Sequence, residues 1–213
     1  MLADVNWAIV ASLATAAGTL VLAVATFSSV RSANRSAKAS ELALQEGMRP
    51  VLTQSRIDDP SQKIMFQEGY WVKVDGGRAG IEATDDVIYF VISLRNIGEG
   101  IAVLQAWDWH PDRASGADPL RPVEQFRRQL RDLYVPAGDV GLWQGALRDR
   151  EMEGWADMAK AVRAKEPITL DLLYSDMAGG QRTVSRFTIV PWHDDTWSAA
   201  VVRHWMLDRD GPR

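Results

Sequence analysis

Histidine and carboxylate side chains are the candidate metal ligands of this sequence, because its 213 residues include no cysteine. The three histidines are His110, His193 and His204. In the segment AWDWHPD, Asp108 and His110 are expected to share one face of a strand, and Trp107 and Trp109 the other. In WHDD, His193 precedes two aspartates in a predicted turn. A mixed nitrogen and oxygen site for a divalent cation requires the fold to join these segments. The alternative is a histidine hydrogen-bonded at a sheet margin, beside solvated turn carboxylates.

Other segments do not match a catalytic or phosphate-binding motif. The glycines of NIGEG precede an apolar run typical of a strand, whereas phosphate loops open a helix or end in Gly-Lys-Ser/Thr. This segment is predicted to be a tight β turn. No serine lies in a Gly-x-Ser-x-Gly elbow, and the adjacent pairs Asp58–Asp59 and Asp85–Asp86 are predicted in turns. We therefore predict no catalytic residue, no cofactor, no metal site and no enzymatic activity.

Tryptophan is abundant, with nine residues in the chain and eight of them after residue 70. The large apolar rings predict a packed core in the carboxyl-terminal part. They also allow a surface on which a ligand could stack. The candidate residues for such a ligand surface are Trp107, Trp109, His110, Trp192 and His193.

Residues 5–30 contain no charged side chain, and the run 7–30 is long enough as a helix to span the roughly 30 Å of a bilayer core. A transmembrane helix is therefore predicted for residues 1–30, and a buried helix of a soluble core is the alternative. The segment does not resemble a cleaved signal peptide, because Asp4 rather than a cation precedes the apolar run.

Cationic residues follow the apolar run at Arg31, Arg35 and Lys38, with a spacing that places them on one helical face. Positive residues near a span stay on the cytoplasmic side, so the amino terminus is predicted outside and the rest of the chain in the cytoplasm. The three side chains are predicted to lie at the membrane interface and to contact anionic lipid headgroups. The predicted location is the inner (plasma) membrane, crossed once.

Good helix formers continue through residues 31–49, which are predicted to form a helical stalk ending near Gly47 and Pro50. Small residues recur along one stripe of the helix at alternating spacings of four and three. They are Ser12, Ala16, Thr19, Ala23, Thr26, Val30, Ala33, Ala37, Ser40 and Leu44. Such a stripe favours close approach of helices, and hence a homo-oligomer or a membrane partner. An Ala- and Ser-rich composition produces similar stripes without association.

Residues 50–213 have the sequence pattern of a β domain, with short apolar runs separated by turn residues. Strands are expected near residues 50–57, 69–74, 87–95, 101–110, 131–135, 140–147, 168–175, 182–190 and 197–207. This number and spacing predict a mainly β chain with an antiparallel, immunoglobulin-like β-sandwich. Polar alternation over residues 183–188 predicts a solvent-exposed face, and residues 151–167 predict one short helix.

The segments LRDLYVPAGDVGLWQGALRD, LDLLYSDMAGGQRTVSRFTI and VVRHWMLDRDGPR resemble uncharacterised bacterial single-pass membrane proteins of actinobacterial type. The resemblance covers nearly the whole chain and implies an amino-terminal span, a helical stalk and a carboxyl-terminal β-sandwich-like domain. It implies no activity and no functional residues.

The net charge of −4 and pI near 5.4 provide no strong basic field, so nucleic acid is not expected as a partner. Membrane lipid and a protein partner or second copy are the expected partners. The first hypothesis is a non-enzymatic interaction or scaffolding module anchored in the membrane. The second is a membrane-tethered sensor with an aromatic pocket for a small ligand. The third is a metal-dependent hydrolase built on His110 and His193.

Overall fold

A computed structural model describes residues 7–193 and 196–209 of the chain. Contacts between residues divide the chain into two units, Met1–Glu46 and Gly47–Arg213. The segment MLADVN, the two aspartates after His193 and the last four residues lie outside the described residues.

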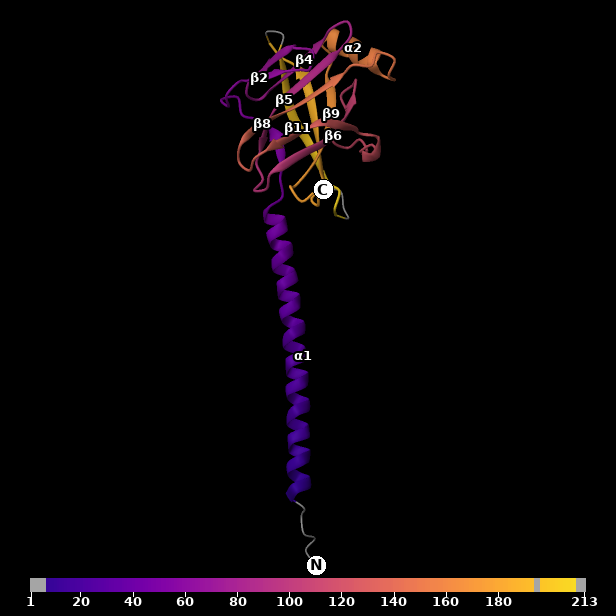
Figure 1. Ribbon diagram of the computed structural model, residues 1–213. Coiled ribbons are helices and arrows are strands. Elements are labelled where there is room, and N and C mark those ends of the chain that lie inside the picture. Colours follow the sequence, from indigo (N-terminus) through magenta and orange to yellow (C-terminus); the bar gives the residue numbers. More distant parts are fainter. Residues whose placement is uncertain (1–6, 194–195, 210–213) are drawn as a thin grey trace, which may run out of the picture. The chain divides into compact units, whose positions relative to one another are not determined.

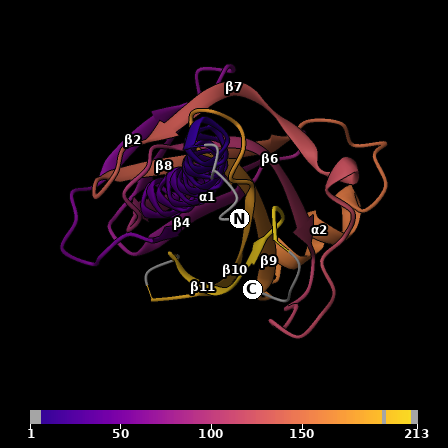
Figure 2. The ribbon, with the colours of Figure 1, turned by 90° about the horizontal axis from the view of Figure 1, so that it is seen from below.

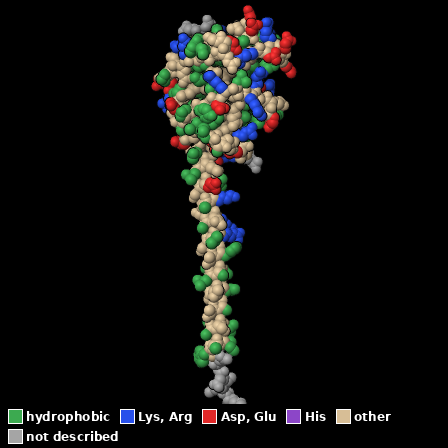
Figure 3. Space-filling view, viewed as in Figure 1, with side chains coloured by type: hydrophobic (Ala, Val, Ile, Leu, Met, Phe, Trp, Pro, Cys, Tyr) green, Lys and Arg blue, Asp and Glu red, His purple; other side chains and the backbone are tan. Residues whose placement is uncertain are grey.

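Helix α1 (Trp7–Gly47) is continuous over 41 residues, and none of its side chains is buried (Figure 1). The predicted membrane segment and the predicted stalk are therefore one helix, which ends at the expected glycine. Hydroxyl groups along its apolar part donate to carbonyls three or four residues earlier, at 2.8–2.9 Å, and belong to Ser12, Thr15, Thr19 and Ser28. These bonds satisfy polar groups inside the helix, which is long and apolar enough to cross a membrane. Figure 3 shows charged side chains only toward the carboxyl-terminal part of α1.

The second unit is built mainly from strands. They are β1 (Leu52–Gln54), β2 (Gln62–Met65), β3 (Trp71–Val74), β4 (Arg78–Ala83), β5 (Ile88–Asn96), β6 (Ala102–His110), β7 (Arg127–Val135), β8 (Val140–Leu147), β9 (Ile168–Ser175), β10 (Thr183–Pro191) and β11 (Trp197–Met206). A short 3₁₀ helix, η1 (Val123–Gln125), precedes β7, and α2 (Trp155–Arg163) lies between β8 and β9. The predicted short helix is confirmed, and the sequence missed only β2 and β4.

Nine strands form one antiparallel sheet in the order β1-β5-β4-β11-β10-β9-β6-β7, with β8 paired to β5. The sheet curls, and Figure 2 shows its strands along an arc that brings β8 toward β7. The mainly β class is confirmed, but an immunoglobulin-like sandwich is not. The described strands follow one continuous ladder that curls into a half-barrel, instead of two separate facing sheets.

Apolar side chains fill the inside of the curled sheet. The largest fully buried aromatic residues there include Trp143, Trp197, Phe90 and Phe187. Helix α2 adds five buried residues to this core, including Trp155 and Met158. The β2–β3 hairpin covers a second apolar cluster on the other face of β5, formed with Tyr89 and Val91.

The predicted solvent-exposed face of residues 183–188 is wrong, because both faces of this part of β10 are buried. Phe187 points into the core, while Arg186 on the opposite face is covered by residues 115–118 and by the ring of Trp205. A loop that packs over the sheet therefore covers polar side chains that alternation alone places in water.

Candidate functional site

Asp108 and His110 lie on the face of β6 opposite the two core tryptophans, as the sequence predicts. The Nε2 atom of His110 lies 3.5 Å from a carboxylate oxygen of Asp171 on β9 and 3.8 Å from one of Asp108. Asp171 in turn accepts two hydrogen bonds from Arg186 on β10, both at 2.8 Å. Asp171 and Arg186 are directly opposite in the β9–β10 ladder, and neither side chain is exposed.

The two aspartates of this cluster have pKa shifts of opposite sign. Burial alone would raise the pKa of Asp171, but the hydrogen-bonded guanidinium of Arg186 and the nearby His110 outweigh burial and hold it below its usual value. Burial raises the pKa of Asp108, because Arg121, 3.3 Å away at the rim, compensates only in part. The cluster is thus organised around the Asp171–Arg186 pair, with Asp108 beside it.

The metal hypothesis finds no support in the described part of the chain, where no cluster of three or more His, Asp or Glu side chains suits a cation. His193 packs its ring against Trp192, with centroids 5.2 Å apart. Trp192 is half exposed and lies under the guanidinium of Arg78, 4.7 Å from its ring centroid. His110 lies beside the carboxylates of Asp108 and Asp171, so the two predicted segments have different neighbours.

A second polar network holds the start of the domain. The hydroxyl of Tyr174 accepts a hydrogen bond from the Leu52 main-chain nitrogen at 3.1 Å and lies 2.9 Å from the Ser185 hydroxyl. The Nδ1 atom of His204 lies 2.7 Å from the same serine oxygen. Burial lowers the pKa of His204. Ser185 is fully buried and shared among these groups, so this Ser–His pair is structural and is not a nucleophile open to substrate.

The NIGEG turn closes over residues 48–52, the segment that follows α1. A Cβ atom on Gly98 would lie 2.2 Å from the Arg49 carbonyl oxygen, and one on Gly100 would lie 1.7 Å from that of Met48. Only glycine permits this approach. Arg49 is buried and forms a salt bridge with Asp208 at 2.6 Å. The segment is not a phosphate-binding loop, but the predicted tight β turn is not confirmed, because the chain only bends here between β5 and β6, which do not pair with each other. Its glycines serve backbone packing.

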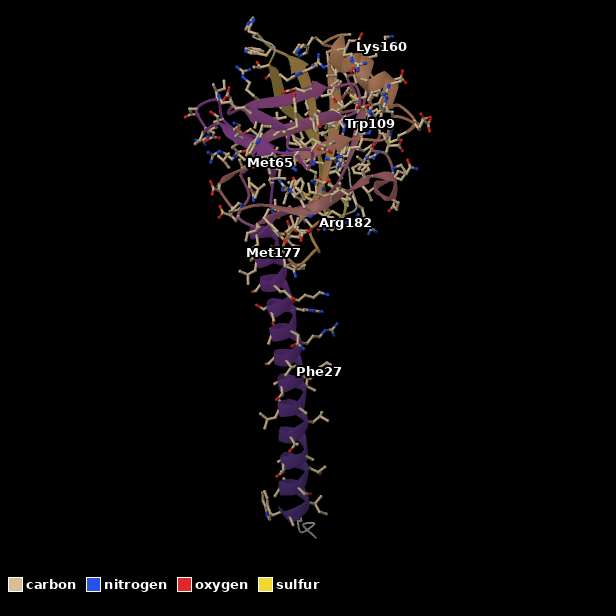
Figure 4. All side chains as sticks on the ribbon, turned by 45° about the horizontal axis from the view of Figure 1, so that its top comes forward. Phe27, Met65, Trp109, Lys160, Met177 and Arg182 are labelled. Carbon is tan, nitrogen blue, oxygen red and sulfur yellow. The ribbon has the colours of Figure 1, made fainter. Side chains whose placement is uncertain are left out.

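Two clefts lie beside the part of β7 that separates from β6. Leu104 pairs with Leu133 and Ala106 pairs with Arg128, so residues 129–132 of β7 stand opposite the single residue Gln105. This four-residue bulge opens space on both sides of β7. One cleft, of about 430 Å³, lies between β7, β8 and the end of β2. A second, of about 540 Å³, lies between β7 and β6. Figure 4 labels Met65 and Arg182, which line the first and second clefts respectively.

The first cleft is lined by cationic, amide and aromatic groups. Its charged lining residues are Arg127, Arg128, Arg131 and Arg148. Trp107, one of the predicted ligand-surface residues, contributes to the lining, and the guanidinium of Arg127 lies 5.8 Å from its ring centroid. Of the other predicted residues, Trp109 is a core residue packed beside α2 (Figure 4) and Trp192 lies at the β10–β11 turn. The structure therefore does not bring the five predicted residues together.

Side chains bridge the opening between β7 and β8, where the described part of the sheet has no ladder. The Gln129 amide donates to the Gln144 main-chain carbonyl at 2.9 Å, and its oxygen accepts from the indole of Trp143 at 3.2 Å. Arg131 donates to the Gln144 side chain at 2.8 Å. The sequence missed this site, because its only signal was a run of arginines in a strand with little apolar character.

No family model and no curated protein matches the chain. Among solved structures, a crystal structure of β-glucosidase from Kluyveromyces marxianus in complex with glucose is similar to part of it, with 15% sequence identity and a TM-score of 0.22. The similarity covers 61% of this chain and 13% of the glucosidase chain. A TM-score this low supports neither a fold assignment nor a function.

Proposed function

We propose that the protein is a membrane-anchored, non-catalytic binding module whose β domain is presented to a protein partner in the cytoplasm. The observation that carries this proposal is α1, which is apolar, 41 residues long and has no buried side chain. A helix with this apolar surface needs a bilayer or another helix around it. The exposed hydroxyls bonded back to its own carbonyls reduce the cost of placing them in lipid.

The proposed orientation is supported by the cations after the apolar run. Arg31, Arg35 and Lys38 are exposed on α1, where they would contact anionic headgroups on the cytoplasmic side. The small-residue stripe of the same helix supports association with a second copy or with another membrane helix. The resemblance to actinobacterial single-pass membrane proteins supports the same arrangement.

The test is crosslinking and affinity capture of the full-length protein from membranes, with a version lacking residues 1–48 as control. We expect the full chain to recover a defined protein partner and the shortened chain to lose membrane association. A reporter fused at the carboxyl end should be active only inside the cell. Activity only outside the cell would contradict the orientation, and extraction of the full chain by buffer alone would contradict the anchor.

The second candidate is a sensor for a small ligand, favoured by the cleft that contains Trp107. Binding there should change the fluorescence of Trp107 or Trp143, since both rings lie at or beside the cleft and 5.2 Å from each other. Isothermal titration with small organic anions, using the full chain in nanodiscs, tests this candidate. Saturable binding that disappears in Arg127→Ala supports the sensor.

A further inference from the structure

One hydrogen-bonding edge of β8 has no paired strand in the described part of the sheet. On β5, the main-chain nitrogen of Asn96 donates to the main-chain carbonyl of Asp139, on the side of β8. The Ser93 carbonyl accepts from the main-chain nitrogen of Ser55, on the opposite side. Because main-chain groups alternate along an antiparallel strand, the residues of β8 that pair toward β5 are Gly141, Trp143, Gly145 and Leu147. The main-chain groups of Leu142, Gln144 and Ala146 point away from β5. The bond from the Gln129 side chain to the Gln144 carbonyl agrees with this alternation.

The free edge of β8 faces a concentration of positive charge. The cleft beside it is lined by four arginines and, among the described residues, by no carboxylate. Arg148 pairs with Glu68, but none of the three β7 arginines forms an ion pair with a described carboxylate. In a chain with a net charge of −4, this local excess of positive charge favours an acidic occupant.

We propose that the cleft binds an extended, acidic segment of a partner protein, which adds to the free edge of β8 as a further strand. This inference rests on the proposed binding function and identifies the chemistry of the partner. Donors and acceptors on alternate residues of β8 repeat at about 6.6–6.8 Å, which matches an extended peptide backbone. A small anion would engage the arginines but would leave these main-chain groups without a partner strand. The side chain of Gln129 moves aside when the peptide backbone takes its place at the Gln144 carbonyl.

The probe is a fluorescent peptide of about ten residues in which Glu and Val alternate, long enough to cover the edge. It is titrated against the full-length protein in zwitterionic nanodiscs, and binding is followed by fluorescence anisotropy. We expect saturable binding that weakens with added salt. A peptide with Lys in place of Glu should not bind. The Glu–Val peptide methylated on alternate main-chain nitrogens of its bonding edge should also fail to bind, because it keeps the charges but loses its donors.

Two pairs of variants test the charges and the edge separately. Arg131→Glu should weaken binding about tenfold or more, while Arg150→Glu, on an exposed pair outside the cleft lining, should leave it unchanged. Gln144→Pro removes a main-chain donor that points away from β5, so it removes no ladder bond. It should weaken binding about three- to tenfold relative to Gln144→Ala, which keeps the donor. Thermal unfolding of each variant verifies that the domain is folded.

Four results would overturn the inference. The first is equal binding of the methylated and unmethylated peptides. The second is displacement of the peptide by glutarate or inorganic phosphate at the peptide's own concentration, which would identify a small-anion site. The third is no binding by any probe. If a partner is captured equally well by wild type, Arg131→Glu and Gln144→Pro, the binding function holds and this cleft is not its site.

Discussion

The buried pair Asp171–Arg186 allows a quantitative test of what holds the centre of the sheet together. Both side chains have 0% exposure, and two hydrogen bonds of 2.8 Å join them. Asp171→Asn removes one charge and leaves the guanidinium buried without its counter-ion, a change that typically costs about 3–5 kcal/mol. One amide oxygen remains as an acceptor, so we expect the lower end, about 3 kcal/mol. With an m-value of about 1–3 kcal/mol per molar urea, the unfolding midpoint should fall by roughly 1–3 M.

The neighbouring substitution Asp108→Asn should change the free energy of unfolding in the opposite direction. Because the folded-state pKa of Asp108 is raised, its ionised form disfavours folding above the unfolded value of about 3.9. At neutral pH the substitution should therefore raise the free energy of unfolding. The pKa of Asp171 is lowered, so its contribution is complete above about pH 3.9 and is lost as the pH falls through the folded-state pKa. The difference between wild type and Asp171→Asn should close in that acidic window.

The assay is urea unfolding of the full chain in nanodiscs, followed by tryptophan fluorescence, since Trp143 and Trp197 are fully buried in the domain. The control is Asp86→Asn, which breaks an exposed pair with Arg150 and should change stability by less than about 1 kcal/mol. If Asp171→Asn costs no more than this control, the buried pair does not stabilise the sheet as argued. Equal signs for Asp108→Asn and Asp171→Asn would refute the account of the pKa shifts.

Three further predictions concern the start of the domain and use the same unfolding assay. Gly100→Ala should destabilise the domain by about 1–3 kcal/mol, because the new methyl group overlaps a main-chain carbonyl, whereas Gly180→Ala meets nothing within 4 Å and should have little effect. Tyr174→Phe should cost about 1–3 kcal/mol, because it leaves the buried Leu52 nitrogen without its acceptor. Burial lowers the pKa of His204, so stability should fall as the pH drops below about 6.5 through the folded-state pKa, and His204→Gln should remove this dependence.

Local patterns predicted the strands whose residues are uniformly apolar or clearly alternating. The expected bounds of β8 and β9 agree with the structure residue for residue. Strand β4 was missed because RAGIEA contains a glycine and two charges. Gly80 is nevertheless required there, since a Cβ atom would lie 2.7 Å from Val72 of the neighbouring hairpin. Such a tertiary contact leaves no trace in periodicity.

The candidate sites were less predictable than the strands. Asp171 and Arg186 each lie in the middle of an apolar strand, and buried charges of this kind require a partner. The sequence therefore contained a signal for a buried ion pair, although not its register. For the cleft, the sequence contained only the run of arginines in β7 and no signal for its geometry, because the cleft depends on a four-residue bulge in the pairing of β7 with β6 and on the approach of β8 from the far end of the sheet.

The arginines of β7 have two physical explanations, recognition of an acidic strand and protection of the β8 edge from aggregation. The sign of the charge distinguishes between them. Charged side chains beside a free strand edge prevent edge-to-edge aggregation, and for that purpose either sign suffices. Binding an acidic strand requires positive charge. If Arg131 only protects the edge, Arg131→Glu keeps the oligomeric state and the partner capture of the wild type, whereas Arg131→Leu associates further through the β domain. If Arg131 recognises a partner, Arg131→Glu also keeps the wild-type oligomeric state but loses the partner, and Arg131→Lys retains much of the binding. Edge protection and partner recognition therefore predict different outcomes for substitutions of Arg131 by Glu, Leu and Lys.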